Sequence, residues 1–157
     1  RGERDLRAAY DAISRLASGE VIVQRMAPPG VAVSVETVDD PSFGALLSVG
    51  VGGIATELLG DRAYRAVPLT DVDAAEMVRS LRAAPLLLGW RGAEAVDVAA
   101  LEDLLLRLST LLDEVPEVVE LRLESIVVGA SGLAVLEAYA EVAPPGGRPD
   151  TGPRRLR

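Results

Sequence analysis

The chain contains 157 residues, a length that suits one domain built around a single hydrophobic core. Hydrophobic residues make up 49% of the chain but aromatic residues only 3%, so we expect a core of Leu, Val, Ala and Ile. The net charge of −8 argues against nonspecific nucleic-acid binding, and the absence of Cys and His excludes disulfides, thiolate chemistry and histidine as a base or metal ligand.

The first part of the chain predicts one helix and two strands. Apolar residues at helical spacing predict a helix that ends near Gly19. The short apolar run from Val21 to Gln24 is typical of a buried strand. After a turn at residues 28–30, the alternation from Val31 to Val35 predicts a second strand. The apolar positions of the helix are Leu6, Ala9, Tyr10, Ile13 and Leu16.

The middle of the chain predicts two more strands and a capped helix. Ala45 to Val49 is continuously apolar, and Ala63 to Val67 should form a fourth strand that the following proline ends. Thr70 and Asp73 resemble a capping box, so we expect a helix to begin there. Pro85 is expected to end this helix.

The last third predicts a long helix and a hairpin. Asp97 can cap a helix whose leucine stripe, with Leu104 and Leu108 facing the sheet, should belong to the core rather than to a partner interface. Val118 to Val128 and Leu133 to Val142 are expected to pair around a glycine-containing turn. The order β-β-β-β-α-α-β-β predicts an α+β fold, an antiparallel sheet with helices on one face. The stripe consists of Leu101, Leu104, Leu105, Leu108, Leu111 and Leu112.

The two ends of the chain and its hydropathy lead to expectations about disorder, location in the cell and the length of the parent protein. The segment 144–157 is rich in Pro, Gly and Arg and is expected to be disordered. No apolar run approaches the ~20 residues of a membrane span and no signal peptide is visible, so we expect a cytoplasmic protein. Because the chain starts at Arg1 without Met and opens on a helical pattern, it is expected to be a piece of a longer protein.

Three glycine-containing motifs follow one another along the chain. They are Asp40-Pro41-Ser42-Phe43-Gly44, Gly50-Val51-Gly52-Gly53 and Gly89-Trp90-Arg91-Gly92. Dense glycines let backbone amides approach a ligand closely, and Arg65 and Arg91 favour an anionic ligand such as phosphate or a nucleotide. The alternative is that these glycines only serve turns.

Taken together, these features resemble the ATP-grasp domain of ADP-forming acyl-CoA synthetases, the enzymes that make acetyl-CoA and related thioesters. Closely similar domains are fused to GNAT-type protein acetyltransferases. The resemblance covers residues 1–143 and implies the C-terminal subdomain of the ATP-grasp fold. The features that match are Val21 to Met26, Gly30, the three glycine motifs, Glu57, Pro68-Leu69 and the closing hairpin.

The resemblance implies the interconversion of acid, CoA and ATP with acyl-CoA, ADP and phosphate, in which the ATP-grasp part handles nucleotide and magnesium. The implied partners are an N-terminal ATP-grasp half with a phosphate-binding lysine and the CoA-binding domains of the same protein, which bring CoA or acyl-CoA. This chain has no lysine and no phosphorylated histidine, so the isolated chain should be inactive. Neither nucleic acid nor a membrane is an expected partner. The alternative is a degenerate, non-catalytic regulatory domain of a GNAT-family acetyltransferase.

The resemblance also implies which residues bind the nucleotide. Val23 and Gln24 match a hinge strand whose backbone faces adenine, and the alternative is a plain core strand. Gly52 and Gly53 match a glycine pair near the phosphates. The charged positions, for which structural ion pairing is the alternative, are Glu57, Arg65 and Arg91.

The closing hairpin departs from the family pattern. In the family, an acid and an Asn on the first strand and an Asp on the second converge on magnesium. Here Arg122 replaces the acid, Glu124 follows two residues later, and Glu137 replaces the Asp. Glu124 and Glu137 are therefore the implied metal ligands, near-opposite on paired strands, with a solvated cross-strand pair as the alternative. Arg122 should repel the metal and instead neutralise phosphate or pair with Glu124.

Overall fold

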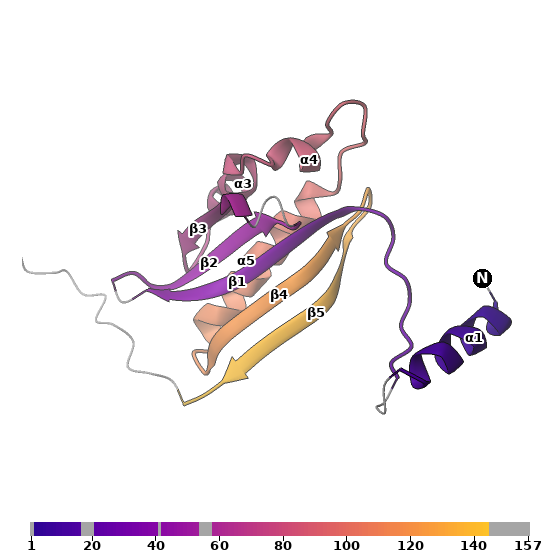
Figure 1. The fold of residues 1–157 in the computed structure, drawn as a ribbon. Coiled ribbons are helices and arrows are strands. Elements are labelled where there is room, and N and C mark those ends of the chain that lie inside the picture. The colour runs from indigo at the N-terminus through magenta and orange to yellow at the C-terminus, as the bar shows by residue number, and fades with distance from the viewer. Residues whose placement is uncertain (1, 17–20, 41, 54–57, 145–157) are drawn as a thin grey trace, which may run out of the picture.

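The fold is a five-stranded antiparallel sheet with helices packed on one face (Figure 1). The computed structural model describes residues 2–16, 21–40, 42–53 and 58–144. The strands are β1 (Val31–Asp40), β2 (Gly44–Val51), β3 (Arg62–Ala66), β4 (Val118–Val128) and β5 (Leu133–Val142), and the helices are α1 (Glu3–Ser14), α3 (Asp71–Ser80), α4 (Ala84–Leu88) and α5 (Val98–Glu114). The predicted α+β class is confirmed.

The strand order in the sheet is β3-β2-β1-β4-β5, which makes β1 the central strand. On one side β1 pairs with β2, from Val33 opposite Val51 to Asp40 opposite Gly44. On the other side it pairs with β4, beginning with Val31 opposite Val128. All the strands predicted from residue 31 onward are present, and β4 and β5 have the predicted bounds.

The core lies between the sheet and helices α3, α4 and α5. Alternation along β1 buries Val33 and Val35, which are 1% and 2% exposed. Met77, Leu87 and Leu101 reach the same cluster from the three helices and are fully buried. Among the described residues no buried hydrophobic side chain is aromatic, as the composition predicts.

The predicted capping box at the start of α3 is confirmed. The Thr70 hydroxyl accepts the Asp73 N–H at 3.2 Å, and the Asp73 carboxylate accepts the Thr70 N–H at 2.9 Å. Hydrogen bonds from the Thr70 side chain and backbone hold the pKa of Asp73 below its usual value, with a smaller contribution from the Arg65 guanidinium. These bonds fix where the chain leaves β3 and enters the helical layer.

The leucine stripe of α5 faces the core, as predicted. Leu101 and Leu105 are fully buried, and Leu108 is 8% exposed. Leu104 packs at the border of the core. Leu111 lies at the margin of the stripe, where its side chain is 37% exposed.

The prediction that Pro85 ends the preceding helix is wrong. Helix α3 ends at Ser80, and Leu81 is extended with ψ 138°. Pro85 instead lies in the first turn of α4. A proline is tolerated there because the first N–H groups of a helix have no intrahelical partner.

The predicted strand from Val21 to Gln24 is also absent. This segment has no regular secondary structure, and Ile22 and Val23 are 84% and 63% exposed. A strand requires a neighbour to complete its hydrogen-bond ladder, and among the described residues the sheet ends at β3 and β5. The segment lines a shallow apolar groove with α1, and both lie apart from the sheet (Figure 1).

The predicted first helix is present as α1, but none of its residues is buried. The disorder predicted for residues 144–157 falls, apart from Pro144, outside the described residues. Within the described part of the chain, no helix has the length and apolar character needed to span a membrane.

Candidate functional site

One of the three predicted glycine motifs lies at an end of the sheet where Gly30 and the β4–β5 turn also lie. Strand β1 begins there, β2 ends there, and the β4–β5 turn closes the same end, since Val31 pairs with Val128 and Val33 with Val51. We call this the glycine end and define it by Gly30, Gly52, Gly53 and the turn at residues 129–132.

Close backbone contacts explain part of this glycine content. The Gly52 N–H donates to the Ala32 carbonyl at 2.7 Å, and a Cβ at Gly52 would lie 3.1 Å from the Ala32 Cβ. A Cβ at Gly30 would collide with the Val128 carbonyl. Gly53 has φ 121°, a conformation that favours glycine. Packing and turn geometry therefore require glycine here, whatever ligand binds.

Arg91 lies in the turn that follows α4. The turn after α4 has positive φ at Gly89, Arg91 and Gly92, and 52° is unusual for an arginine. The Arg91 guanidinium lies 5.8 Å from the ring centroid of Trp90, which is 52% exposed. The segment that follows this turn is fastened to the β4–β5 hairpin by Asp97.

Asp97 makes this connection with two hydrogen bonds. Its N–H donates to the Gly129 carbonyl at 2.7 Å, and its carboxylate accepts the Gly132 N–H at 2.7 Å. The same carboxylate accepts the Ala100 N–H at 3.0 Å and caps α5 as predicted. The bonds from Ala100 and Gly132 keep the pKa of Asp97 below its usual value. The sequence could not reveal the bond to Gly132, because the two residues are distant along the chain.

The first glycine motif lies at the opposite end of the sheet. Ser42 and Phe43 donate their N–H groups to the Asp40 carboxylate at 2.7 and 3.0 Å. This is an Asx-type turn that joins β1 to β2. For this motif the structure favours the turn interpretation over a ligand contact.

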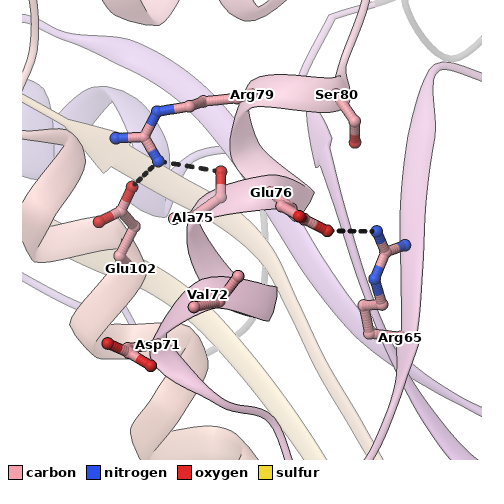
Figure 2. Close-up of a pocket in the computed structure, with 8 residues that line it drawn as sticks. All are labelled: Arg65, Asp71, Val72, Ala75, Glu76, Arg79, Ser80 and Glu102. Atoms are coloured by element: carbon pink, nitrogen blue, oxygen red, sulfur yellow. Dashed lines mark hydrogen bonds and ion pairs between the residues drawn. The ribbon is translucent and has the colours of Figure 1, made fainter.

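Arg65 points toward helix α3 and faces Glu76 (Figure 2). Its guanidinium is 3.3 Å from the Glu76 carboxylate and 4.0 Å from that of Asp73. Nearby, Arg79 pairs with Glu102 at 2.9 Å. These residues border a shallow depression on α3 in which both arginines already have acidic partners.

Two further predicted residues lie away from the glycine end. Val23 and Gln24 lie on the exposed segment beside α1. Glu57 lies outside the described residues. The structure therefore places Gly52 and Gly53 at the glycine end and holds the segment that follows the Arg91 turn to the same end through Asp97, but it does not assemble the whole predicted set.

In the closing hairpin, Arg122 is surrounded by carboxylates. Its Nε lies 2.9 Å from the Glu120 carboxylate and its Nη1 3.5 Å from that of Glu124. The guanidinium also stacks 4.6 Å from the ring centroid of Tyr139 on β5. Pairing of Arg122 with Glu124, one of the two predicted alternatives, is present.

The hairpin acids do not fit a magnesium site. Glu137 is the register partner of Ser125, one residue from the predicted position opposite Glu124, and register shifts occur on both sides of this pair. Among the described residues no group of three His, Cys, Asp or Glu is arranged to hold a metal ion. Magnesium requires near-octahedral oxygen coordination at about 2.0–2.1 Å, and a guanidinium already contacts Glu124.

The face of the sheet without helices, which we call the open face, carries a second arginine that the sequence analysis missed. The Arg62 guanidinium lies 3.1 Å from the Glu36 carboxylate and donates to the Ser48 and Ser34 hydroxyls at 2.9 and 3.2 Å. The alternation of polar Ser34 and Glu36 with buried valines in β1 was the available signal, because it places both polar residues on one face.

Comparison with known proteins identifies the family. The family model of the ATP-grasp domain matches residues 2–142, and the chain belongs to this family. Over 144 residues it is 38% identical to the acetate–CoA ligase [ADP-forming] I of Archaeoglobus fulgidus, covering 87% of this chain and 21% of that protein. Over 106 residues it is 41% identical to the β subunit of acetate–CoA ligase [ADP-forming] I of Pyrococcus furiosus, covering 68% of this chain and 46% of that protein.

A solved structure supports the same assignment. The fold is similar to a dinucleotide forming acetyl-coenzyme A synthetase 1 of Ca. Korarchaeum cryptofilum in complex with coenzyme A and Mg-AMPPCP, with a TM-score of 0.81 and 34% identity. The match covers 91% of this chain and 65% of that chain. The chain thus spans a fifth to two thirds of these relatives, and the predicted ATP-grasp resemblance is confirmed.

Proposed function

We propose that the chain is the nucleotide-binding part of an ADP-forming acyl-CoA synthetase, which interconverts acid, CoA and ATP with acyl-CoA, ADP and phosphate. The observation that supports this most strongly is the fold match to the Korarchaeum synthetase, whose structure contains both coenzyme A and a nucleotide analogue. The named relatives in sequence are also ADP-forming CoA ligases.

The glycine end is the proposed phosphate-binding part of this site. Phosphoryl transfer depends mainly on positioning and charge neutralisation. The close backbone approach that Gly52 and Gly53 allow can serve the first task, and the Arg91 guanidinium the second. ATP and ADP are the proposed ligands. In this proposal the backbone of Val23 and Gln24 faces adenine, and Glu57 is a further residue of the nucleotide site. Arg65 can take part only by exchanging its contacts with Glu76.

The proposed activity requires further domains. We propose that an N-terminal ATP-grasp half supplies a phosphate-binding lysine and that CoA-binding domains supply CoA and the phosphorylated histidine. This chain contains neither Lys nor His, and the relatives in sequence are at least twice as long as the matched part. The proposed location is the cytoplasm, where ATP and CoA are both available. The relatives are ligases, so the alternative of a regulatory domain in an acetyltransferase is not adopted.

The test compares this chain with the protein encoded by its complete reading frame. The complete protein should form ADP and acyl-CoA from ATP only when CoA and a short carboxylic acid are both present. The isolated chain should form none above background, because it lacks lysine, histidine and half of the proposed site. Arg91→Ala in the complete protein should weaken ADP binding with an unchanged melting temperature.

Two outcomes would contradict the proposal. One is a complete, folded protein that neither binds ADP in calorimetric titration nor forms acyl-CoA. The other is turnover by the isolated chain, which would show that the proposed division of the site between domains is wrong.

A further inference from the structure

We propose that Arg122 is the built-in cation of the β4–β5 hairpin and that it excludes a divalent metal ion from Glu120 and Glu124. Arg122 alone then determines whether this surface holds a guanidinium or a divalent metal ion. The inference concerns the hairpin itself, and its significance for nucleotide binding rests on the function proposed above.

The position of Arg122 follows from strand alternation. Leu121 and Leu123 are buried against the helices, so Arg122 between them points to the open face. Its register partners are Glu36 on β1 and Tyr139 on β5, so it lies within the sheet rather than at its edge.

The carboxylates around Arg122 require a positive charge between them. Glu120 and Glu124 flank it on its own strand, each in an ion pair with its guanidinium. Glu36 lies across on β1, and the Arg62 guanidinium contacts that carboxylate at 3.1 Å. Like-charged carboxylates on one face repel each other unless a cation separates them. Arg122 supplies this charge for Glu120 and Glu124.

Arg122 is held in place by more than charge. Its guanidinium stacks on the Tyr139 ring at 4.6 Å, and its side chain is 39% exposed. Contact with an aromatic face and two carboxylates restricts its rotamers far more than a single surface ion pair does. It therefore occupies the space beside Glu124 instead of sampling solvent.

A divalent ion would have to displace this arrangement. Magnesium needs oxygen ligands at about 2.0–2.1 Å, so it would have to approach the Glu124 carboxylate more closely than the guanidinium does at 3.5 Å. The positive charge of Arg122 would remain beside it and lower its affinity. In the complete protein, a metal ion would therefore arrive with the nucleotide phosphates and would not be held by the hairpin in advance.

The experiment titrates the full 157-residue chain with Mn²⁺ alone and measures free Mn²⁺ by electron paramagnetic resonance. The natural chain should show no saturable binding below about 1 mM. Arg122→Glu replaces the cation with a third carboxylate beside Glu124 and should strengthen binding at least about tenfold. If that variant does not fold, Arg122→Gln removes the positive charge alone and should still raise the affinity.

The matched control is Arg107→Glu, which changes the net charge equally at an exposed site on α5. It should leave Mn²⁺ binding unchanged. Saturable binding by the natural chain that Arg122→Glu does not improve would overturn the proposal, and so would an equal gain in the Arg107 variant. No nucleotide or enzyme assay is involved, so the result is independent of the test of ligase function.

Discussion

At the scale of single residues, the Asp97 carboxylate connects two separate elements. One carboxylate caps α5 through the Ala100 N–H and also holds the β4–β5 turn through the Gly132 N–H. Both bonds favour the ionised carboxylate, which is why its pKa is lowered. A group with a lowered folded-state pKa stabilises the fold above its unfolded pKa, and this contribution disappears as the pH falls through the folded value.

We therefore predict that Asp97→Asn lowers the thermal stability of the chain by an amount that depends on pH. The melting temperature of the variant should lie below that of the natural chain at about pH 6, and the gap should narrow as the pH falls below about 4. Thermal melts followed by circular dichroism between about pH 2.5 and pH 6 measure this gap. A gap that is constant over the whole range would mean that Asp97 stabilises the fold through its shape and not through its charge.

At the scale of elements, α1 and α5 show that one sequence pattern can have two outcomes. Both helices carry apolar residues at helical spacing. In α5 the apolar face meets the sheet and is buried, whereas in α1 the side chains of Leu6, Tyr10 and Ile13 remain 48–52% exposed. Periodicity predicts that a helix forms and which face is apolar, but not which surface covers that face.

The burial of α5 predicts a clear difference between two leucine substitutions. Leu108→Ala should lower the free energy of unfolding by about 2–5 kcal/mol, because it removes buried methyl groups and leaves a cavity. Leu111→Ala, at a side chain that is 37% exposed, should cost less than about 1 kcal/mol. Urea denaturation of both variants provides the comparison. Equal costs, or a cost below about 0.5 kcal/mol for Leu108, would show that the helix is rotated from this position.

At the scale of the whole molecule, features that depend on neighbouring residues could be predicted, and those that depend on distant ones could not. The capping box at Thr70 and the hairpin of β4 and β5 are local, and both were predicted correctly. The strand at residues 21–24 failed because its apolar run says nothing about a pairing partner. The candidate site shows the same limit. One glycine motif indicated the glycine end, but the ion pair between Arg65 and Glu76 depends on how α3 packs against β3, which the sequence does not reveal.

The separation of α1 from the sheet leads to a prediction for the whole chain. Stability comes mainly from apolar surface removed from water. None of the described residues between 2 and 26 is fully buried, whereas the buried core is made entirely of residues from 33 to 128. Gly30 packs against the Val128 carbonyl, so the boundary of the stable unit lies between these two regions.

A chain that begins at Ala27 should therefore melt within about 2 °C of the full chain, since it keeps every residue of the core. A second truncation that begins at Glu36 removes Val33 and Val35 from the central strand and should unfold cooperatively at a much lower temperature or not fold at all. Calorimetry on the three chains measures both effects. A loss of more than about 5 °C on removal of residues 1–26 would show that α1 packs on the sheet in solution and contributes to the same core.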